Sequence, residues 1–411
     1  MQRKVPGIVF LIVSLTVRIA AAGAFPDPAG IPEISQDALI VHDAPADVGM
    51  DAKALGKINE RMREFVRMKQ AAGIVTLVAR KGKVVHLGAV GEADIASSRK
   101  MTRDSVFAIA SMTKPITASA VMILIDEGKL QLDDPVSKYI PEFKETRLKG
   151  KVKPAREITL RDCLRHTSGL TGDQMNVGSL ADTAVMLARS ELVFEPGSKW
   201  QYGPGLSVAG RIVEIASGKP FNQFLAERIF LPLKMKETTF FPTSEQLQRL
   251  AKMYQPTADK HDLELGRHWL LEFPVKSSPN PSGGLFSTAA NLVRFYQMML
   301  NRGELDGQRI LSAQAVKEMT SLQSGDLATG FTPGCGWGLG FCLVQKPQGA
   351  TRVLSPGTFG HGGAFGTQGW IDPQREMIFV MLVQRANFGN GDGSELRSEL
   401  QRLAVEAIQN R

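Results

Sequence analysis

Runs of apolar residues near both ends of the chain predict a β-sheet. Two short runs rich in β-branched residues, 74–78 and 84–87, are joined through the polar stretch Lys81-Gly82-Lys83, which is typical of a hairpin. An amphipathic pattern over 394–408 predicts a helix close to the C-terminus. Three more runs with strand character precede that helix: 338–344, 366–371 and 377–383.

The middle of the chain has a different period. From about 115 to 330 the apolar residues mostly recur at helical spacing, as in 206–217 and 289–300, and the loops between them contain proline and glycine. Because strands lie at both ends and helices lie between them, the simplest architecture is an α/β domain, approximately 50–114 and 331–411, with a helical domain inserted at 115–330.

Composition narrows the class of protein. The 411 residues suffice for about two to three structural units, and 43% hydrophobic with 22% charged residues is typical of globular proteins. The formal net charge is +8, but basic and acidic residues are interspersed, as in 57–64, which is typical of a solvated helix face. A folded enzyme or binding protein is therefore expected, with no nucleic-acid partner.

The N-terminus has the pattern of a secretion signal. Arg3 and Lys4 precede an apolar run over 5–17, and small residues follow at 20–24, with cleavage sites after Ala22 or Ala24. The apolar run is shorter than the roughly 20 residues that a membrane span needs. We therefore expect residues 1–24 to be a signal peptide and the processed chain, without an integral membrane span, to be periplasmic or extracellular.

The cysteines indicate neither a metal site nor a disulfide framework. Cys163, Cys335 and Cys342 lack the spacing of a zinc or redox motif. Cys335 and Cys342 belong to a stretch with strand character, in which a straight strand would separate them by up to about 23 Å, beyond disulfide reach. No dinucleotide or metal-binding motif is present, so no cofactor is expected.

Ser111 and Lys114 are the first candidates for chemistry. They follow an apolar run, 106–110, and precede a segment with helical spacing, 116–127. One helical turn separates the two residues, so both side chains project on one face near a helix N-terminus, where Lys114 is placed to take the hydroxyl proton of Ser111. A second Ser-x-x-Lys sequence, 97–100, lies in a charged loop with no helix start after it and is not expected to act.

Two further segments carry candidate polar groups. Tyr202 lies in the loop 200–205 ahead of a predicted helix, where a tyrosine is either a packing residue or a catalytic one. Gly360-His361-Gly362-Gly363-Ala364 precedes a strand-like stretch. Such a run is either a turn or a site in which glycines let a substrate lie beside backbone N–H groups, with His361 as a donor at its mouth.

The order of these three segments resembles a known family. Ser-x-x-Lys, a middle polar motif and a third box match the pattern of β-lactamases and penicillin-binding proteins. The chain resembles the class C β-lactamase group, which includes family VIII carboxylesterases, D-aminopeptidases and D-alanyl-D-alanine carboxypeptidases. The resemblance covers about 73–383 and implies an antiparallel sheet formed by both chain ends. Four further segments support it: 164–170, 194–202, 282–288 and 370–373.

The resemblance implies a role for each matching residue. Ser111 would be the nucleophile that forms an acyl-enzyme, and Lys114 would accept its proton. Tyr202 would relay protons, a task that requires a pKa lowered by nearby positive charge.

The third box would complete the site. His361 would occupy the position of the lysine in Lys-Thr-Gly, the N–H groups of Ser111 and Ala364 would form the oxyanion hole, and Gly362 and Gly363 would lie beside the substrate.

Two departures from the family pattern bear on the substrate. Pro204 occupies the position of the asparagine in the usual Tyr-x-Asn motif. The side-chain amide that contacts the lysine and the substrate in the family is therefore missing. His361 replaces a permanent cation, and with an ordinary pKa of about 6.5 it would titrate near ambient pH. Both changes favour an esterase or a D-amino-acid peptidase over a lactamase. His166, in the stretch 166–169, is expected to be part of a structural turn.

The sequence thus predicts a secreted serine hydrolase that acts through Ser111 on a small-molecule ester, amide or D-amino-acid peptide, with weak β-lactamase activity at most. The alternative is a catalytically weak penicillin-binding or sensor-type protein on the same fold. Pro204 supports this alternative. The joint presence of Ser111, Lys114, Tyr202 and His361 favours catalysis.

Overall fold

The computed structural model describes residues 44–172, 178–267, 278–388 and 391–409. The chain divides into two units, 1–36 and 37–411, and all described residues belong to the second. The predicted signal peptide lies outside the described residues. Among the helices of the described ranges, none has the length and apolarity needed to cross a membrane.

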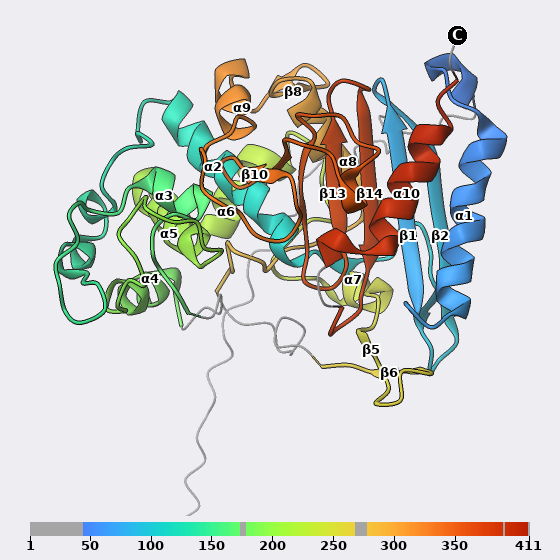
Figure 1. Ribbon diagram of the computed structural model, residues 1–411, viewed down its shortest axis with the longest axis horizontal. Helices are drawn as coiled ribbons and strands as arrows, with labels where there is room; N and C mark the ends of the chain where they lie inside the picture. Colours follow the sequence, from blue (N-terminus) through green and yellow to red (C-terminus); the bar gives the residue numbers. More distant parts are fainter. Residues whose placement is uncertain (1–43, 173–177, 268–277, 389–390, 410–411) are drawn as a thin grey trace, which may run out of the picture. The chain divides into compact units, whose positions relative to one another are not determined.

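An antiparallel sheet built from both ends of the chain organises the second unit (Figure 1). Its eight strands in the described residues follow the spatial order β10-β11-β12-β13-β14-β1-β2-β3. Its N-terminal and C-terminal parts meet where β1 pairs with β14, from Ile74 opposite Val383 to Arg80 opposite Met377. The predicted fold class is therefore confirmed. The strands are β1 (Gly73–Arg80), β2 (Lys83–Asp94), β3 (Arg99–Lys100), β10 (Cys335–Trp337), β11 (Cys342–Val344), β12 (Phe359–Gly362), β13 (Gln368–Asp372) and β14 (Met377–Val383).

Helices cover both faces of this sheet. α1 (Ala52–Arg67) and α10 (Glu395–Glu406) pack against each other, α1 on β1 and β2 and α10 on β14, as Figure 1 shows. α8 (Ala289–Leu300) packs against β1, β13 and β14 from the other face. α8 lies within the range predicted for the helical domain, yet its packing places it with the sheet.

The double cover explains the sequence of β14. Val380 and Leu382 belong to the core on the α8 side, whereas Phe379 and Met381 belong to the core on the α1 and α10 side. Because successive side chains of a strand point to opposite faces, a strand covered on both sides needs a continuous apolar run rather than an alternating one.

The helical part is centred on α2 (Thr113–Asp126), which contacts α5, α9 and β12. Every residue from Thr113 to Leu124 is buried, as expected for a helix that neighbours surround on all sides. The other helices are α3 (Leu160–Arg165), α4 (Leu180–Ala188), α5 (Gly205–Ser217), α6 (Phe221–Leu225), α7 (Ser244–Arg249) and α9 (Ala313–Met319). Short ladders join β4 (Phe107–Ala108) to β7 (Phe286–Ser287), β5 (Tyr254–Pro256) to β6 (Leu263–Leu265), and β8 (Glu304–Leu305) to β9 (Gln308–Arg309).

The straight strand predicted over 338–344 is wrong. The chain reverses between β10 and β11, where Gly338 N–H donates to the Phe341 carbonyl and Gly340 adopts φ +74°. Cys335 and Cys342 therefore lie on neighbouring strands with their thiols in hydrogen-bonding contact, not far apart. Both are free thiols, and their diagonal register is poorly suited to a disulfide.

Candidate active site

Ser111 lies in a short 3-10 turn, Ala110–Met112, between β4 and α2. Ala110 has φ +46°, in the left-handed region that residues with a side chain rarely adopt. Strained residues of this kind gather at functional sites, where the surrounding packing holds them in place. The strain thus marks the residue that directly precedes Ser111.

Lys114 is held beside Ser111 in the core. Its Nζ atom lies 3.1 Å from Ser111 Oγ and donates a hydrogen bond to the carbonyl oxygen of Ser282 at 2.6 Å. Burial lowers the pKa of Lys114 well below its ordinary value, because a buried ammonium loses its hydration. A neutral Lys114 has a lone pair with which to accept the proton of the Ser111 hydroxyl.

Tyr202 reaches the same hydroxyl from the loop before α5. Its phenol hydrogen-bonds Ser111, and its ring lies 4.6 Å from Lys114 Nζ. Burial raises the pKa of the Tyr202 phenol, the negative charge of Asp392 adds to this, and the hydrogen bond with Ser111 opposes it only in part. This direction is opposite to the lowered pKa that the family resemblance implied. Tyr202 is therefore a protonated phenol that can donate a proton.

His361 lies within β12, and only 3% of its surface is exposed. Its Nδ1 lies 2.6 Å from the carbonyl oxygen of Gly362, which assigns the proton to Nδ1 and leaves Nε2, 3.5 Å from the Tyr202 hydroxyl, as an acceptor. Burial, together with the positive charge that Lys114 carries when it is protonated, lowers the pKa of His361 to about 3. The expectation that His361 titrates near ambient pH is therefore wrong: the ring stays neutral.

The pH profile of hydrolysis should report Lys114 and not His361. A base with a lowered pKa is lost as the pH falls through that pKa, so kcat/KM should rise with pH and level off well below the pKa of a free lysine. The His361→Gln variant should keep the shape of this profile between about pH 5 and 9, since the wild-type ring is neutral there. Rates for a neutral and an anionic ester check this. An acid-side gain for the anionic ester, absent from the variant, would contradict it.

The third box lies directly against the segment that leads into Ser111. A Cβ atom at Gly363 would overlap Thr367 and the carbonyl oxygen of Ile109, so only glycine permits this approach. A Cβ atom at Gly362 would overlap the carboxylate of Asp392. Protein atoms thus fill the space that a side chain at either glycine would need. A substrate could contact these two residues only through their backbone.

Ala364, which follows these glycines, is exposed. Its N–H group donates no hydrogen bond among the residues that the structure describes. Such a free N–H group is the kind of donor that an oxyanion hole requires.

Sequence analysis assigned no role to Ser282. Its carbonyl oxygen accepts the hydrogen bond from Lys114, and its hydroxyl lies 2.9 Å from the Ser207 hydroxyl on α5. The family pattern has an asparagine at the position of Pro204, and its side-chain amide would contact the lysine. In this chain the Ser282 carbonyl accepts a hydrogen bond from Lys114 instead. The resemblance of the segment 282–288 to the family was the one indication in the sequence. Because the acceptor is a backbone carbonyl, which every residue type has, the residue type at 282 could not reveal its role.

His166 contacts Tyr202 and the loop that carries it. It ends α3 with φ +63°, its ring centroid lies 4.4 Å from that of Tyr202, and its Nδ1 accepts a hydrogen bond from the N–H of Gly203 at 3.3 Å. The turn that sequence analysis treated as structural therefore also packs against the loop that presents Tyr202.

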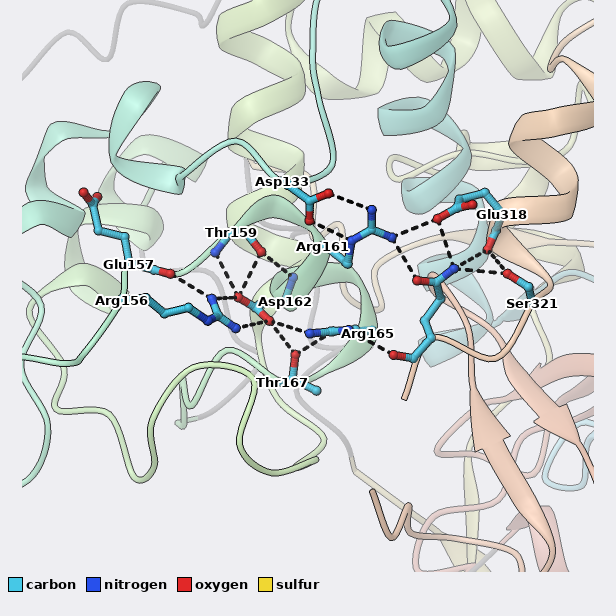
Figure 2. Close-up of polar contacts among 11 residues, drawn as sticks. Asp133, Arg156, Glu157, Thr159, Arg161, Asp162, Arg165, Thr167, Glu318 and Ser321 are labelled. Atoms are coloured by element: carbon cyan, nitrogen blue, oxygen red, sulfur yellow. Dashed lines mark hydrogen bonds and ion pairs between the residues drawn. The ribbon is translucent and has the colours of Figure 1, made fainter. Parts of the chain in front are cut away.

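A buried carboxylate holds this turn in place (Figure 2). Asp162 accepts hydrogen bonds from Arg156 at 2.6 and 3.0 Å, from Arg165 at 3.2 Å and from Thr167 Oγ1 at 2.7 Å. Burial alone would raise the pKa of Asp162, but the hydrogen bonds from Arg156 and Thr167 outweigh it and keep the group ionised. Because Thr167 follows His166, the network fixes the turn.

Arg161 extends this network to α9. It pairs with Asp133 at 2.8 Å and with Glu318 at 2.8 Å, as Figure 2 shows. The neighbouring Arg165 donates to the carbonyl oxygen of Gln323 at 3.0 Å. α3 is thereby tied to the segment that leads from α9 toward β10.

Six rings enclose the reacting groups and are referred to below as the aromatic cluster. Trp337 is fully buried, with its ring centroid 5.5 Å from His361 and 6.0 Å from Tyr202. These rings contribute to the burial of Tyr202 and His361, and burial is the main cause of the shift in both pKa values. The cluster consists of His166, Trp200, Tyr202, Phe331, Trp337 and His361.

The structure therefore brings Ser111, Lys114, Tyr202 and His361 together from the 3-10 turn 110–112, α2, the loop before α5, and β12. Such an arrangement suits nucleophilic acyl transfer, with a serine activated by a neutral amine and a phenol as proton donor. In the described residues no group of three or more His, Cys, Asp or Glu side chains is arranged to hold a metal ion.

Comparisons with known proteins agree with this fold. An uncharacterized protein of Mycobacterium tuberculosis (strain CDC 1551 / Oshkosh) is 33% identical over 357 residues, covering 79% of this chain and 88% of its own. Esterase EstB of Burkholderia gladioli is 28% identical over 382 residues, covering 84% of this chain and 94% of its own. The structure of EstCE1, a hydrolase with promiscuous acyltransferase activity, matches with a TM-score of 0.74 and 25% identity, covering 87% and 99%. The Beta-lactamase family model matches residues 58–403. The chain belongs to the Beta-lactamase family of serine hydrolases.

Proposed function

We propose that this protein is an exported serine hydrolase that cleaves carboxylic esters through an acyl-enzyme on Ser111. One observation carries the proposal: the Ser111 hydroxyl contacts both the buried amine of Lys114 and the phenol of Tyr202. A structural serine would not need a desolvated amine at 3.1 Å. Export rests on the basic and apolar pattern of the first 24 residues.

Acylation needs two proton transfers. Lys114 takes the Ser111 proton as Oγ bonds to the acyl carbon, and backbone N–H groups of Ser111 and Ala364 stabilise the oxyanion. The carbon–oxygen bond to the alcohol then breaks, and the leaving oxygen takes the proton of Tyr202, which the Lys114 ammonium replaces. In deacylation, water gives a proton to Lys114 as its oxygen bonds to the acyl carbon. The bond between that carbon and Ser111 Oγ then breaks, Oγ takes the proton of Tyr202, and the Lys114 ammonium restores the phenol, which releases the carboxylic acid.

The site favours esters over lactams and peptides with a free carboxylate. His361 is neutral, so it supplies no cation to anchor a carboxylate. Pro204 supplies no amide to contact a lactam, and Lys114 is already satisfied by the Ser282 carbonyl. The likeness to a protein named an esterase agrees with this preference.

The test is a comparison of substrates with detection of the adduct. The purified protein should cleave p-nitrophenyl butyrate with a higher kcat/KM than nitrocefin or benzylpenicillin, because the groups that anchor a lactam are replaced. Intact-mass analysis after a fluorophosphonate should find one adduct, on Ser111. A kcat/KM for nitrocefin above that for the ester would contradict the proposal.

The same experiment separates the alternative. A stoichiometric penicillin adduct on Ser111 that forms without turnover of any ester would favour a penicillin-binding or sensor-type protein. Pro204 is the residue that supports this alternative.

A further inference from the structure

We propose that Phe331 forms the outer wall of a subsite that binds an aromatic or bulky apolar group of the ester beside Tyr202. This inference rests on the proposed function, because it names the substrate class of the same site. Phe331 lies in the loop between α9 and β10 and was not singled out by sequence analysis.

The backbone at Phe331 is strained. It has φ +73°, and the N–H of Thr332 donates to the carbonyl oxygen of Gly330 at 3.1 Å, so Phe331 is the central residue of a three-residue turn. A γ-turn with its central residue at positive φ is rare, and a bulky residue at positive φ is an outlier. Glycine would adopt this conformation without strain. The phenyl ring must therefore account for the presence of phenylalanine at this position.

The ring is held at the edge of the catalytic tyrosine. Its centroid lies 4.9 Å from that of Tyr202 at an interplanar angle of 83°, and 6.1 Å from that of Trp200 at 90°. Edge-to-face contacts of this kind fix the orientation of a ring. A third ring, that of Trp337, lies 6.2 Å from Phe331 between centroids. These contacts position Phe331 beside the ring of Tyr202, the residue whose phenol contacts Ser111.

Neighbouring bonds hold the loop. Thr329 Oγ1 donates to the carbonyl oxygen of Cys335 at 2.6 Å, and the N–H of Cys335 bonds the Thr332 carbonyl at 3.3 Å. The loop leads into β10, where Trp337 is fully buried in the aromatic cluster. The position of the ring is therefore set before a substrate arrives, which lowers the entropic cost of binding.

Core packing alone does not explain the ring. Phe331 is 41% exposed, whereas Trp337 is 0% exposed and already covers the inner side of the cluster. An exposed phenyl surface next to a reacting group gains most when a substrate covers it. Aromatic and bulky apolar groups have the surface to do so, and they arrive either on the acyl side or on the alcohol side of an ester.

Two substrate series distinguish the two sides. In the first series, p-nitrophenyl acetate and p-nitrophenyl phenylacetate share a leaving group and differ in the acyl group. In the second series, ethyl acetate and benzyl acetate share the acyl group and differ in the alcohol. We expect the wild type to prefer the aromatic member of one series, by about tenfold in kcat/KM, as is typical of one well-placed apolar contact.

The variants separate the ring from the backbone. Phe331→Gly should reduce that preference at least fivefold (about 1 kcal/mol) without lowering the melting temperature through strain, because glycine suits φ +73°. Phe331→Tyr should keep the preference. Leu231→Ala, which removes another exposed apolar side chain, outside the cluster, is the control and should change neither ratio.

The inference would be overturned if Phe331→Gly still showed Ser111-dependent hydrolysis but changed the preference ratio by less than about twofold in both series. Absence of any Ser111-dependent ester cleavage in the wild type would instead overturn the proposed function and this inference with it.

Discussion

Replacing Ser111 by alanine is expected to lower kcat/KM for p-nitrophenyl butyrate by at least about three powers of ten, because removal of a nucleophile abolishes the covalent pathway. The variant should also fail to take up a fluorophosphonate. Steady-state rates and intact mass measure both effects. Alanine occupies no new space, so the fold and the melting temperature should be kept.

The chain offers a matched control for this substitution. Ser97 begins the other Ser-x-x-Lys sequence, is exposed, and lies in a turn before β3. Ser97→Ala should retain wild-type rates. A Ser111→Ala variant with near wild-type hydrolysis would refute the assignment of the nucleophile.

Tyr202→Phe is expected to lower kcat by about two to four powers of ten, the usual contribution of a general acid or base. Phenylalanine keeps the ring contacts with His166 and Lys114 and removes only the hydroxyl that donates a proton. Stopped-flow and steady-state measurements with p-nitrophenyl butyrate test this, with the melting temperature as a check on folding.

Tyr254→Phe is the corresponding control. The Tyr254 hydroxyl accepts a hydrogen bond from the N–H of Ile95, on the polypeptide segment between β2 and β3, and has no part in the site. Its loss should leave kcat unchanged. If Tyr202→Phe kept kcat within about tenfold of the wild type, Tyr202 would not be the proton donor.

Local pattern was sufficient for much of the fold. The run 377–383 predicted β14 and the pattern 289–300 predicted α8, and the structure has both with these bounds. The helix predicted from 116 begins at Thr113, two residues after Ser111. In each case the signal is the spacing of apolar residues, which is contained within the element itself.

The spacing of apolar residues did not predict the turn between β10 and β11 or its close approach to α2. The turn at Gly340 brings the chain so close to α2 that a side chain there would meet Ala118 and the backbone of Lys114, residues more than two hundred positions earlier. The apolar character of 338–344 gives no indication of this contact. The position of the thiols of Cys335 and Cys342 follows from the turn.

For the site, the sequence by itself singled out Ser111, Lys114, Tyr202 and His361 as candidates. Ser111 and Lys114 are one helical turn apart, and their position at the start of a helix, which the second Ser-x-x-Lys lacks, placed the two side chains on one face. The tertiary structure decided their protonation: distant segments bury Lys114 and His361 and lower both pKa values, and the rings around Tyr202 raise its pKa. Protonation depends on the water that surrounding elements exclude, and that exclusion exists only once the chain has folded.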